Sequence, residues 1–166
     1  MSLGLTIFTL VHVALSLVGI GSGLVVVYQF LAAKRRDVWT AIFLSTTVLT
    51  SVTGLFFPVE HFMPSHAVGI LSLLVLAVAL VALYTFHLSG VWRTAYVISS
   101  VIALYLNVFV LVAQLFLKVP ALHALAPTQS EPSFLLTQLA VLALFVVIAV
   151  GAMIRFRRAA IRTDAV

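Results

Sequence analysis

The chain has 166 residues, of which 64% are hydrophobic and only 8% are charged, and its mean hydropathy is +1.29. Soluble domains carry about 25% charged and about 45–50% apolar residues, and a folded body of this size cannot hide so much apolar surface from water. The composition therefore excludes a soluble enzyme, a secreted module and a nucleic-acid-binding domain. It predicts an integral membrane protein.

The net charge of +5 arises from nine basic and four acidic side chains. Seven of the basic residues stand in two short groups, at 34–36 and 155–162, and each group directly follows a long apolar stretch. This placement is typical of the charges that orient membrane helices, and it does not resemble a surface that follows a phosphate backbone. The chain has no cysteine, which excludes disulfides and thiolate metal sites.

Five apolar stretches are long enough to cross a membrane. A hydrocarbon core about 30 Å thick requires roughly 20 apolar residues in a helix. None of the five stretches has Asp, Glu, Lys or Arg in its interior. We predict an all-α integral membrane fold, a bundle of five transmembrane helices, at residues 5–32, 38–57, 66–88, 94–117 and 134–154.

The segments between these stretches contain charges, prolines and glycine. Residues 34–37 are charged, and residues 58–64 hold two prolines and a glutamate. Ser89 and Gly90 predict a tight turn in which Gly90 caps the end of the third helix. Residues 118–133 contain three prolines and several polar side chains, so we expect this loop to fold over the membrane surface.

The positions of Lys and Arg predict the orientation. With the N-terminus outside, the inner side holds eight of the nine basic residues and the outer side holds only Lys118. Basic residues accumulate on the cytoplasmic side of membrane proteins. We therefore expect an outer N-terminus and a cytoplasmic C-terminus, in a bacterial inner (plasma) membrane, with residues 1–154 as one membrane domain and 155–166 as a basic cytoplasmic tail.

Small and polar side chains mark the faces on which membrane helices pack. In the first span they recur every three or four residues from Thr9 onward, and two of them form a small-xxx-small pair of glycines. In the fourth span, polar residues repeat every seven residues, and the second span has the densest content of Ser and Thr. We interpret these faces as packing interfaces, with a substrate pathway as the alternative. The residues concerned are Ser16, Gly19, Gly23, Thr50, Asn107 and Gln114.

Histidine is the side-chain type most suggestive of chemistry, because an ionisable group inside a membrane is a candidate functional group. Haem bound by two histidines requires neutral imidazoles from different helices. We predict a haem b site toward the outer face, with His12 and His66 as axial ligands and His87 as a lesser candidate. The expected boundaries place His12 about two turns deeper than His66, so the pair requires a tilted helix. The pattern is loosely similar to that of the small b-type cytochromes of bacterial membranes.

A metal ion at the outer surface is the alternative use of these histidines. Three or four nitrogen and oxygen ligands suit Zn²⁺ or Cu²⁺. The candidate ligands are Glu60, His61, His66 and His123.

Three functions remain open from the sequence. The first is an accessory membrane protein without a cofactor. The second is a b-type haem protein that exchanges electrons with a quinone or another membrane subunit. The third is a small oligomeric channel or permease. A hydrolase is disfavoured, because Asp37 and Asp164 lie on the inner side while four of the five histidines lie toward the outer side. The membrane redox protein is the most specific of these predictions.

Overall fold

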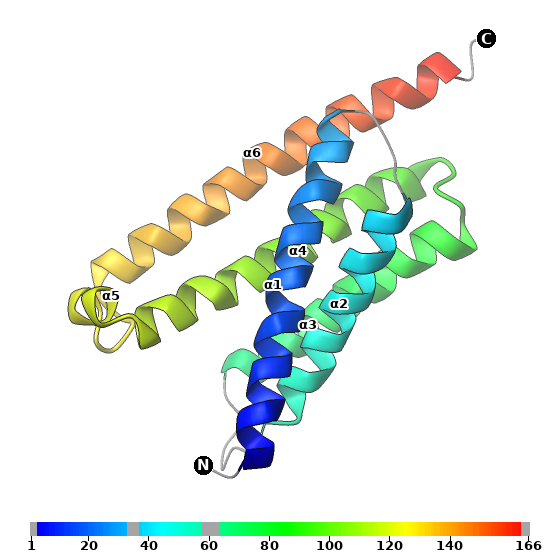
Figure 1. The fold of residues 1–166 in the computed structure, drawn as a ribbon. Coiled ribbons are helices and arrows are strands. Elements are labelled where there is room, and N and C mark those ends of the chain that lie inside the picture. The colour runs from blue at the N-terminus through cyan, green and yellow to red at the C-terminus, as the bar shows by residue number, and fades with distance from the viewer. Residues whose placement is uncertain (1–2, 33–36, 58–63, 164–166) are drawn as a thin grey trace.

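The computed structural model describes residues 3–32, 37–57 and 64–163 (Figure 1). Within these residues every regular element is a helix. Five helical segments are long and apolar enough to cross a membrane: Leu3–Leu31, Val38–Leu55, Ser65–Thr85, Val91–Lys118 and Pro132–Phe156. The prediction of an all-α bundle with five transmembrane helices is confirmed.

The helices agree with the predicted spans to within a few residues, with two larger differences. The short helix α5 (Pro120–Leu125) lies inside the loop expected between the fourth and fifth spans, and α6 (Pro132–Thr163) continues through most of the basic segment expected to be a separate tail. Three of the helices begin at a proline, whose fixed φ and missing N–H suit the first helical turn. The elements are α1 (Leu3–Leu31), α2 (Asp37–Leu55), α3 (Pro64–Leu80), η1 (Val81–Thr85), α4 (Val91–Lys118), α5 (Pro120–Leu125) and α6 (Pro132–Thr163).

The third span ends in a π-helical turn, η1, and not in a glycine cap. His87 and Leu88 have left-handed φ values of 47° and 59°, and the N–H of Leu88 donates to the carbonyl of Ala82 at 3.0 Å. This closure brings the Leu88 side chain into the core. Gly90, with φ 51°, is instead the N-cap of α4. The prediction that Gly90 caps the third helix is therefore wrong, because two non-glycine residues adopt the left-handed conformation before it.

The five long helices pack in a simple order. Helix α1 contacts α2, α4 and α6, helix α2 lies between α1 and α3, and α3 returns to α4. Helices α4 and α6 lie side by side and are joined through α5 (Figure 1). We call the end of the bundle that contains the start of α1 and α5 the outer end, following the orientation predicted from the basic residues, and the opposite end the inner end.

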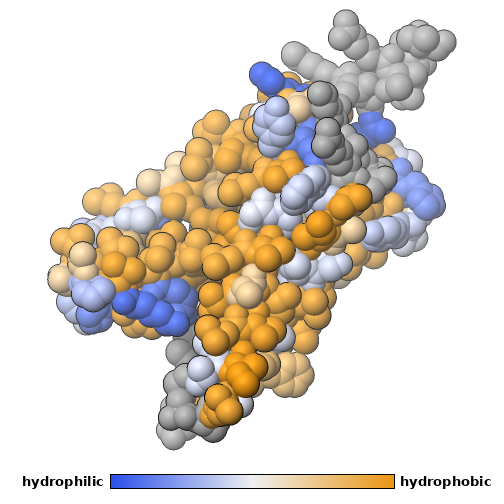
Figure 2. Space-filling model, viewed as in Figure 1, coloured by the Kyte–Doolittle hydropathy of each residue, from blue (hydrophilic) through white to orange (hydrophobic). Residues whose placement is uncertain are grey.

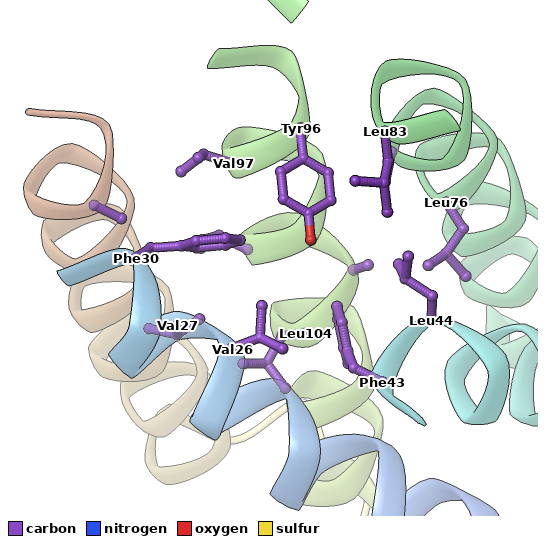
Figure 3. Close-up of a cluster of buried hydrophobic side chains, with 14 of the residues drawn as sticks. Val26, Val27, Phe30, Phe43, Leu44, Leu76, Leu83, Tyr96, Val97 and Leu104 are labelled. Atoms are coloured by element: carbon purple, nitrogen blue, oxygen red, sulfur yellow. The ribbon is translucent and has the colours of Figure 1, made fainter. Parts of the chain in front are cut away.

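The apolar core lies in the inner half of the bundle. All buried residues of α1 fall between Gly19 and Phe30. Figure 3 shows Tyr96 of α4 at the centre of this core, near Phe30, whose ring meets the tyrosine ring edge-on at a centroid distance of 5.5 Å. At the inner end, Arg155 donates to the carbonyl of Leu31 at 3.3 Å. The helices are therefore held together mainly by their inner halves.

At the outer end the bundle divides into two arms. The outer halves of α1, α2 and α3 form one arm, and the end of α4, helix α5 and the start of α6 form the other (Figure 1). Figure 2 shows a notch between the arms, with hydrophilic surface at its edge. The outer half of α1 has no buried residue before Gly19, and it contacts the end of α2, where His12 lies 2.8 Å from the hydroxyl of Thr53.

A compact turn after α5 closes the outer end of the α4–α6 arm. Glu131 accepts hydrogen bonds from the N–H groups of Thr128 and Ser130 and from the Thr128 hydroxyl. Gln129 donates to the carbonyl of Ala113 at 2.7 Å, which fixes the turn to α4. Desolvation acts to raise the pKa of Glu131, but its backbone and Thr128 hydrogen bonds outweigh it and hold the pKa below its ordinary value.

We expect this turn to loosen in acid. A carboxylate with a lowered pKa stabilises the folded turn above its unfolded pKa, and this stability is lost as pH falls through the lower, folded value. Amide exchange at residues 128–131, corrected for the intrinsic rate, should be faster below about pH 4 than at pH 6. In Glu131→Gln the turn should be equally loose at both pH values. Equal protection of the native turn at both pH values would contradict this role of Glu131.

Candidate functional site

The interior of the bundle holds a row of polar side chains at the contact of α1, α2 and α4, which we call the α1–α2–α4 seam. It contains one histidine, one asparagine and several hydroxyl groups: His12 and Ser16 of α1, Thr46, Thr47, Thr50 and Thr53 of α2, and Asn107 of α4. The other candidate is a groove of about 390 Å³ between α2 and the third span, lined by apolar side chains with Ser45 and Tyr84. Because the residues that line this groove include no acid, histidine or base, the seam is the better candidate.

His12 lies at the outer part of the seam against α2. Its Nδ1 is 2.8 Å from the hydroxyl of Thr53, and its ring meets Phe57 edge-on at a centroid distance of 5.0 Å. The Thr53 hydroxyl also lies 2.7 Å from the carbonyl of Leu49 on the preceding turn. Since a hydroxyl has one proton and a backbone carbonyl can only accept, Thr53 donates to Leu49 and accepts from Nδ1 of His12. This arrangement assigns the proton of the neutral imidazole to Nδ1.

One turn further in, α1 meets α4 through polar groups. Ser16 donates to Oδ1 of Asn107 at 3.3 Å. A Cβ atom placed on Gly19 would lie 3.2 Å from both Nδ2 of Asn107 and Oγ1 of Thr47, and 3.3 Å from Oγ1 of Thr46. Glycine at this position therefore allows three polar atoms of α2 and α4 to approach the backbone of α1.

Gly23, one turn of α1 after Gly19, closes the seam on its inner side. A Cβ atom on Gly23 would lie 2.7 Å from Cδ1 of Leu104 and 2.8–2.9 Å from the ring of Phe43. Both side chains belong to the buried core. The polar part of the seam thus ends at an apolar contact of three helices.

Several buried polar atoms of the seam have no partner in the part of the chain that the structure describes. They include Oγ1 of Thr47, Oγ1 of Thr50 and Nδ2 of Asn107. The three side chains are 1%, 7% and 8% exposed. In hydrocarbon each unsatisfied group costs several kcal/mol, so these atoms mark a place where a hydrogen-bonding occupant would be favourable.

The structure does not bring His12 and His66 together. His66 is half-buried in the first turn of α3. Helix α3 packs on the face of α2 that contains Ser51, whose hydroxyl is 3.0 Å from Ser72 of α3. Thr53, the partner of His12, is two residues further along α2 and therefore about 200° around the helix. The hydroxyl that holds His12 therefore lies on a different face of α2 from the one on which α3 packs.

The other histidines lie away from the seam. His87 is exposed at the inner end in its left-handed conformation, and His123 is exposed on α5. Of the four ligands predicted for a metal ion, Glu60 and His61 lie outside the described residues. Among the residues that are described, no three His, Asp or Glu side chains lie close enough to hold a metal ion.

Comparison with known protein families, curated proteins and solved structures finds no match to this chain. Its function is therefore argued from the seam alone.

The sequence identified the α1 and α4 residues of the seam more completely than those of α2. Thr53 and Phe57, which fix the His12 ring, were not candidates, because the hydroxyl-rich second span offers no pattern that singles out one threonine. Lys118 was assigned only to the outer surface, and it stands eleven residues after Asn107, on the same face of α4. The contact between His12 and the outer end of α2 could not be predicted from the sequence, because the sequence does not show which helix packs against α1 near His12.

Proposed function

We propose that the protein is a small membrane electron-transfer protein, or a subunit of a membrane redox complex, that binds haem b through His12. The observation that carries this proposal is the hydrogen bond from His12 to Thr53. With its proton on Nδ1, the neutral imidazole has a free lone pair on Nε2. A ligating histidine characteristically donates its other ring N–H to an acceptor that fixes its tautomer and orientation.

The surroundings of His12 support a site that opens toward the outer end. His12 is half-buried, in the half of α1 that has no buried residue. Gln114 and Lys118 of α4 are exposed and continue the face that carries Asn107. The ammonium group of Lys118 would suit an anionic propionate at the membrane surface. A quinone or another membrane subunit reaching this side from the bilayer is the proposed redox partner.

The position of α2 changes the ligand set that the sequence predicted. His66 belongs to α3, which packs on another face of α2 from the Thr53 hydroxyl, and His87 lies at the inner end, so the proposal assigns only His12 as a histidine ligand. His66, His87 and His123 then serve as matched controls for its replacement.

The test is the visible spectrum of the protein produced with a haem supply, before and after reduction with dithionite. We expect a Soret band that shifts on reduction, is lost in His12→Ala, and persists in His66→Ala, His87→Ala and His123→Ala. The iron-binding nitrogen is removed only in the first of these variants. A colourless folded protein, or a band that survives in His12→Ala, would refute the proposal and leave a cofactor-free accessory protein or a permease.

Thr53→Val tests whether the hydrogen bond to His12 strengthens haem binding. Removing the hydrogen-bond partner of a ligating histidine typically weakens ligand binding by about 10–100-fold. Haem titration should show such a loss in Thr53→Val and none in Thr6→Val, which changes the same residue type elsewhere in the outer half of the bundle. Equal haem affinities in the two variants would show that Thr53 does not orient His12.

A further inference from the structure

Two of the unpartnered polar atoms of the seam lie near the same point of α1. Nδ2 of Asn107 and Oγ1 of Thr47 both lie 3.2 Å from the position that a Cβ of Gly19 would occupy. Neither atom has a hydrogen-bond partner in the described part of the chain, and both are buried. Oγ1 of Thr50, one turn of α2 nearer the outer end, is also unpartnered.

The chemistry of these groups indicates the kind of occupant. An amide N–H only donates, whereas a threonine hydroxyl both donates and accepts. No described residue of the seam's inner part is acidic or basic, so an ion would lack a counter-charge there. A water molecule donates and accepts, requires two to four polar partners, and is the usual occupant of buried polar sites.

The seam also offers a route by which water can arrive. From Asn107 the polar groups continue outward through Ser16 to His12 and Thr53. His12 is only half-buried, and no residue of α1 on the outer side of Gly19 is buried. In the inward direction the route stops at Gly23, where Leu104 and Phe43 fill the space.

We infer that the outer half of the α1–α2–α4 seam is a hydrated vestibule that admits water from the outer face as far as Gly19 and is closed by Phe43 and Leu104. This inference does not depend on haem. It assigns the buried amide of Asn107 and the hydroxyls of Thr47 and Thr50 to binding water inside the membrane. It also makes Leu104, which lies between Asn107 and Ser100 on α4, the boundary between the wet and the dry part of that helix.

The absence of native cysteine allows a direct test by single-cysteine labelling. Ser16→Cys, Thr47→Cys and Thr50→Cys, in membrane vesicles with the outer face exposed, are treated with Ag⁺, and the unreacted thiols are then counted with a maleimide after denaturation. Leu17→Cys and Leu49→Cys are the controls, because these residues adjoin the test positions in sequence and face the bilayer.

We expect the seam cysteines to react at least about tenfold faster than the controls, since only the thiolate reacts and it does not form in hydrocarbon. Equal rates at seam and control positions would overturn the inference. Ser16→Cys is nearly isosteric, so it decides the result if a threonine variant fails to elute as a monodisperse protein.

A second arm tests the inner boundary. Ser100→Cys, on the inner side of Leu104, should be as unreactive as the controls, and Leu104→Ala in the same chain should make it react. If Ser100→Cys alone reacts as fast as Ser16→Cys, the vestibule is not closed at Leu104. If it stays unreactive in the Leu104→Ala chain, the side chain of Leu104 is not the barrier.

Discussion

Replacing Tyr96 with alanine is expected to lower the free energy of unfolding by about 3–5 kcal/mol, the usual cost of truncating a large aromatic side chain in a packed core. Tyr96 is 1% exposed and is among the largest fully buried side chains. It packs between α1, the third span and its own helix, as Figure 3 shows, with its ring edge-on to Phe30. In a membrane the apolar driving force between helices is weak, so these contacts are the main source of stability.

The matched control is Tyr84→Ala. Tyr84 is 61% exposed, on the lipid-facing side of η1. Its removal makes no internal cavity, and we expect a change within about 0.5 kcal/mol. Both variants can be compared by titrating the detergent-solubilised protein with sodium dodecyl sulfate and following helix content. A similar loss in the two variants would show that the core does not lie where Tyr96 is buried.

The five spans were predictable because span length and hydropathy are local properties. Each helix needs about 20 apolar residues whatever its neighbours are, and charges or prolines end it. The close approach at Gly19 and Gly23 was also predictable in kind, since small residues four apart mark helix contacts in membranes. What the pattern left open was the partner helix, and the structure supplies two of them, α2 and α4.

The separation of the outer arms was not predictable in the same way. Each polar stripe of the first and fourth spans continues outward past the point where the helices part, so neither stripe shows where contact ends. The crossing of two helices depends on the side chains that both present, such as Leu104 against Gly23. The placement of His12 relative to His66 was open for the same reason, because one sequence does not show that α2 packs against both α1 and α3.

The turn that ends the third span was not predictable, because the residues that adopt its left-handed conformation are not glycines. Left-handed φ is expected at glycine, and Gly90 stands at a suitable place. The chain instead uses His87 and Leu88, because burying Leu88 in the core compensates for their backbone strain. Residue preferences for backbone conformation do not show that burial of a side chain such as Leu88 can outweigh the cost of a left-handed φ.

The glycines of α1 provide the second large effect, as a graded series within one helix. Gly23→Ala is expected to lower the free energy of unfolding by about 1–3 kcal/mol through overpacking, since its Cβ would lie 2.7–2.9 Å from Leu104 and Phe43. Gly19→Ala should cost less, because its contacts are at 3.2–3.3 Å. Gly21→Ala, with nothing within 4 Å, should be neutral or stabilising by up to about 1 kcal/mol.

The same detergent titration measures this series, and its order separates two explanations of why α1 is glycine-rich. If glycine only made the helix flexible, the three replacements would have similar effects. If glycine allows α1 to approach α2 and α4, stability follows the order Gly21→Ala, Gly19→Ala, Gly23→Ala from highest to lowest. Gly19→Ala carries a further consequence, because its methyl group would occupy the space toward Asn107 and Thr47. Silver labelling at Ser16→Cys should then persist, while labelling at Thr47→Cys, beyond the new methyl group, should slow.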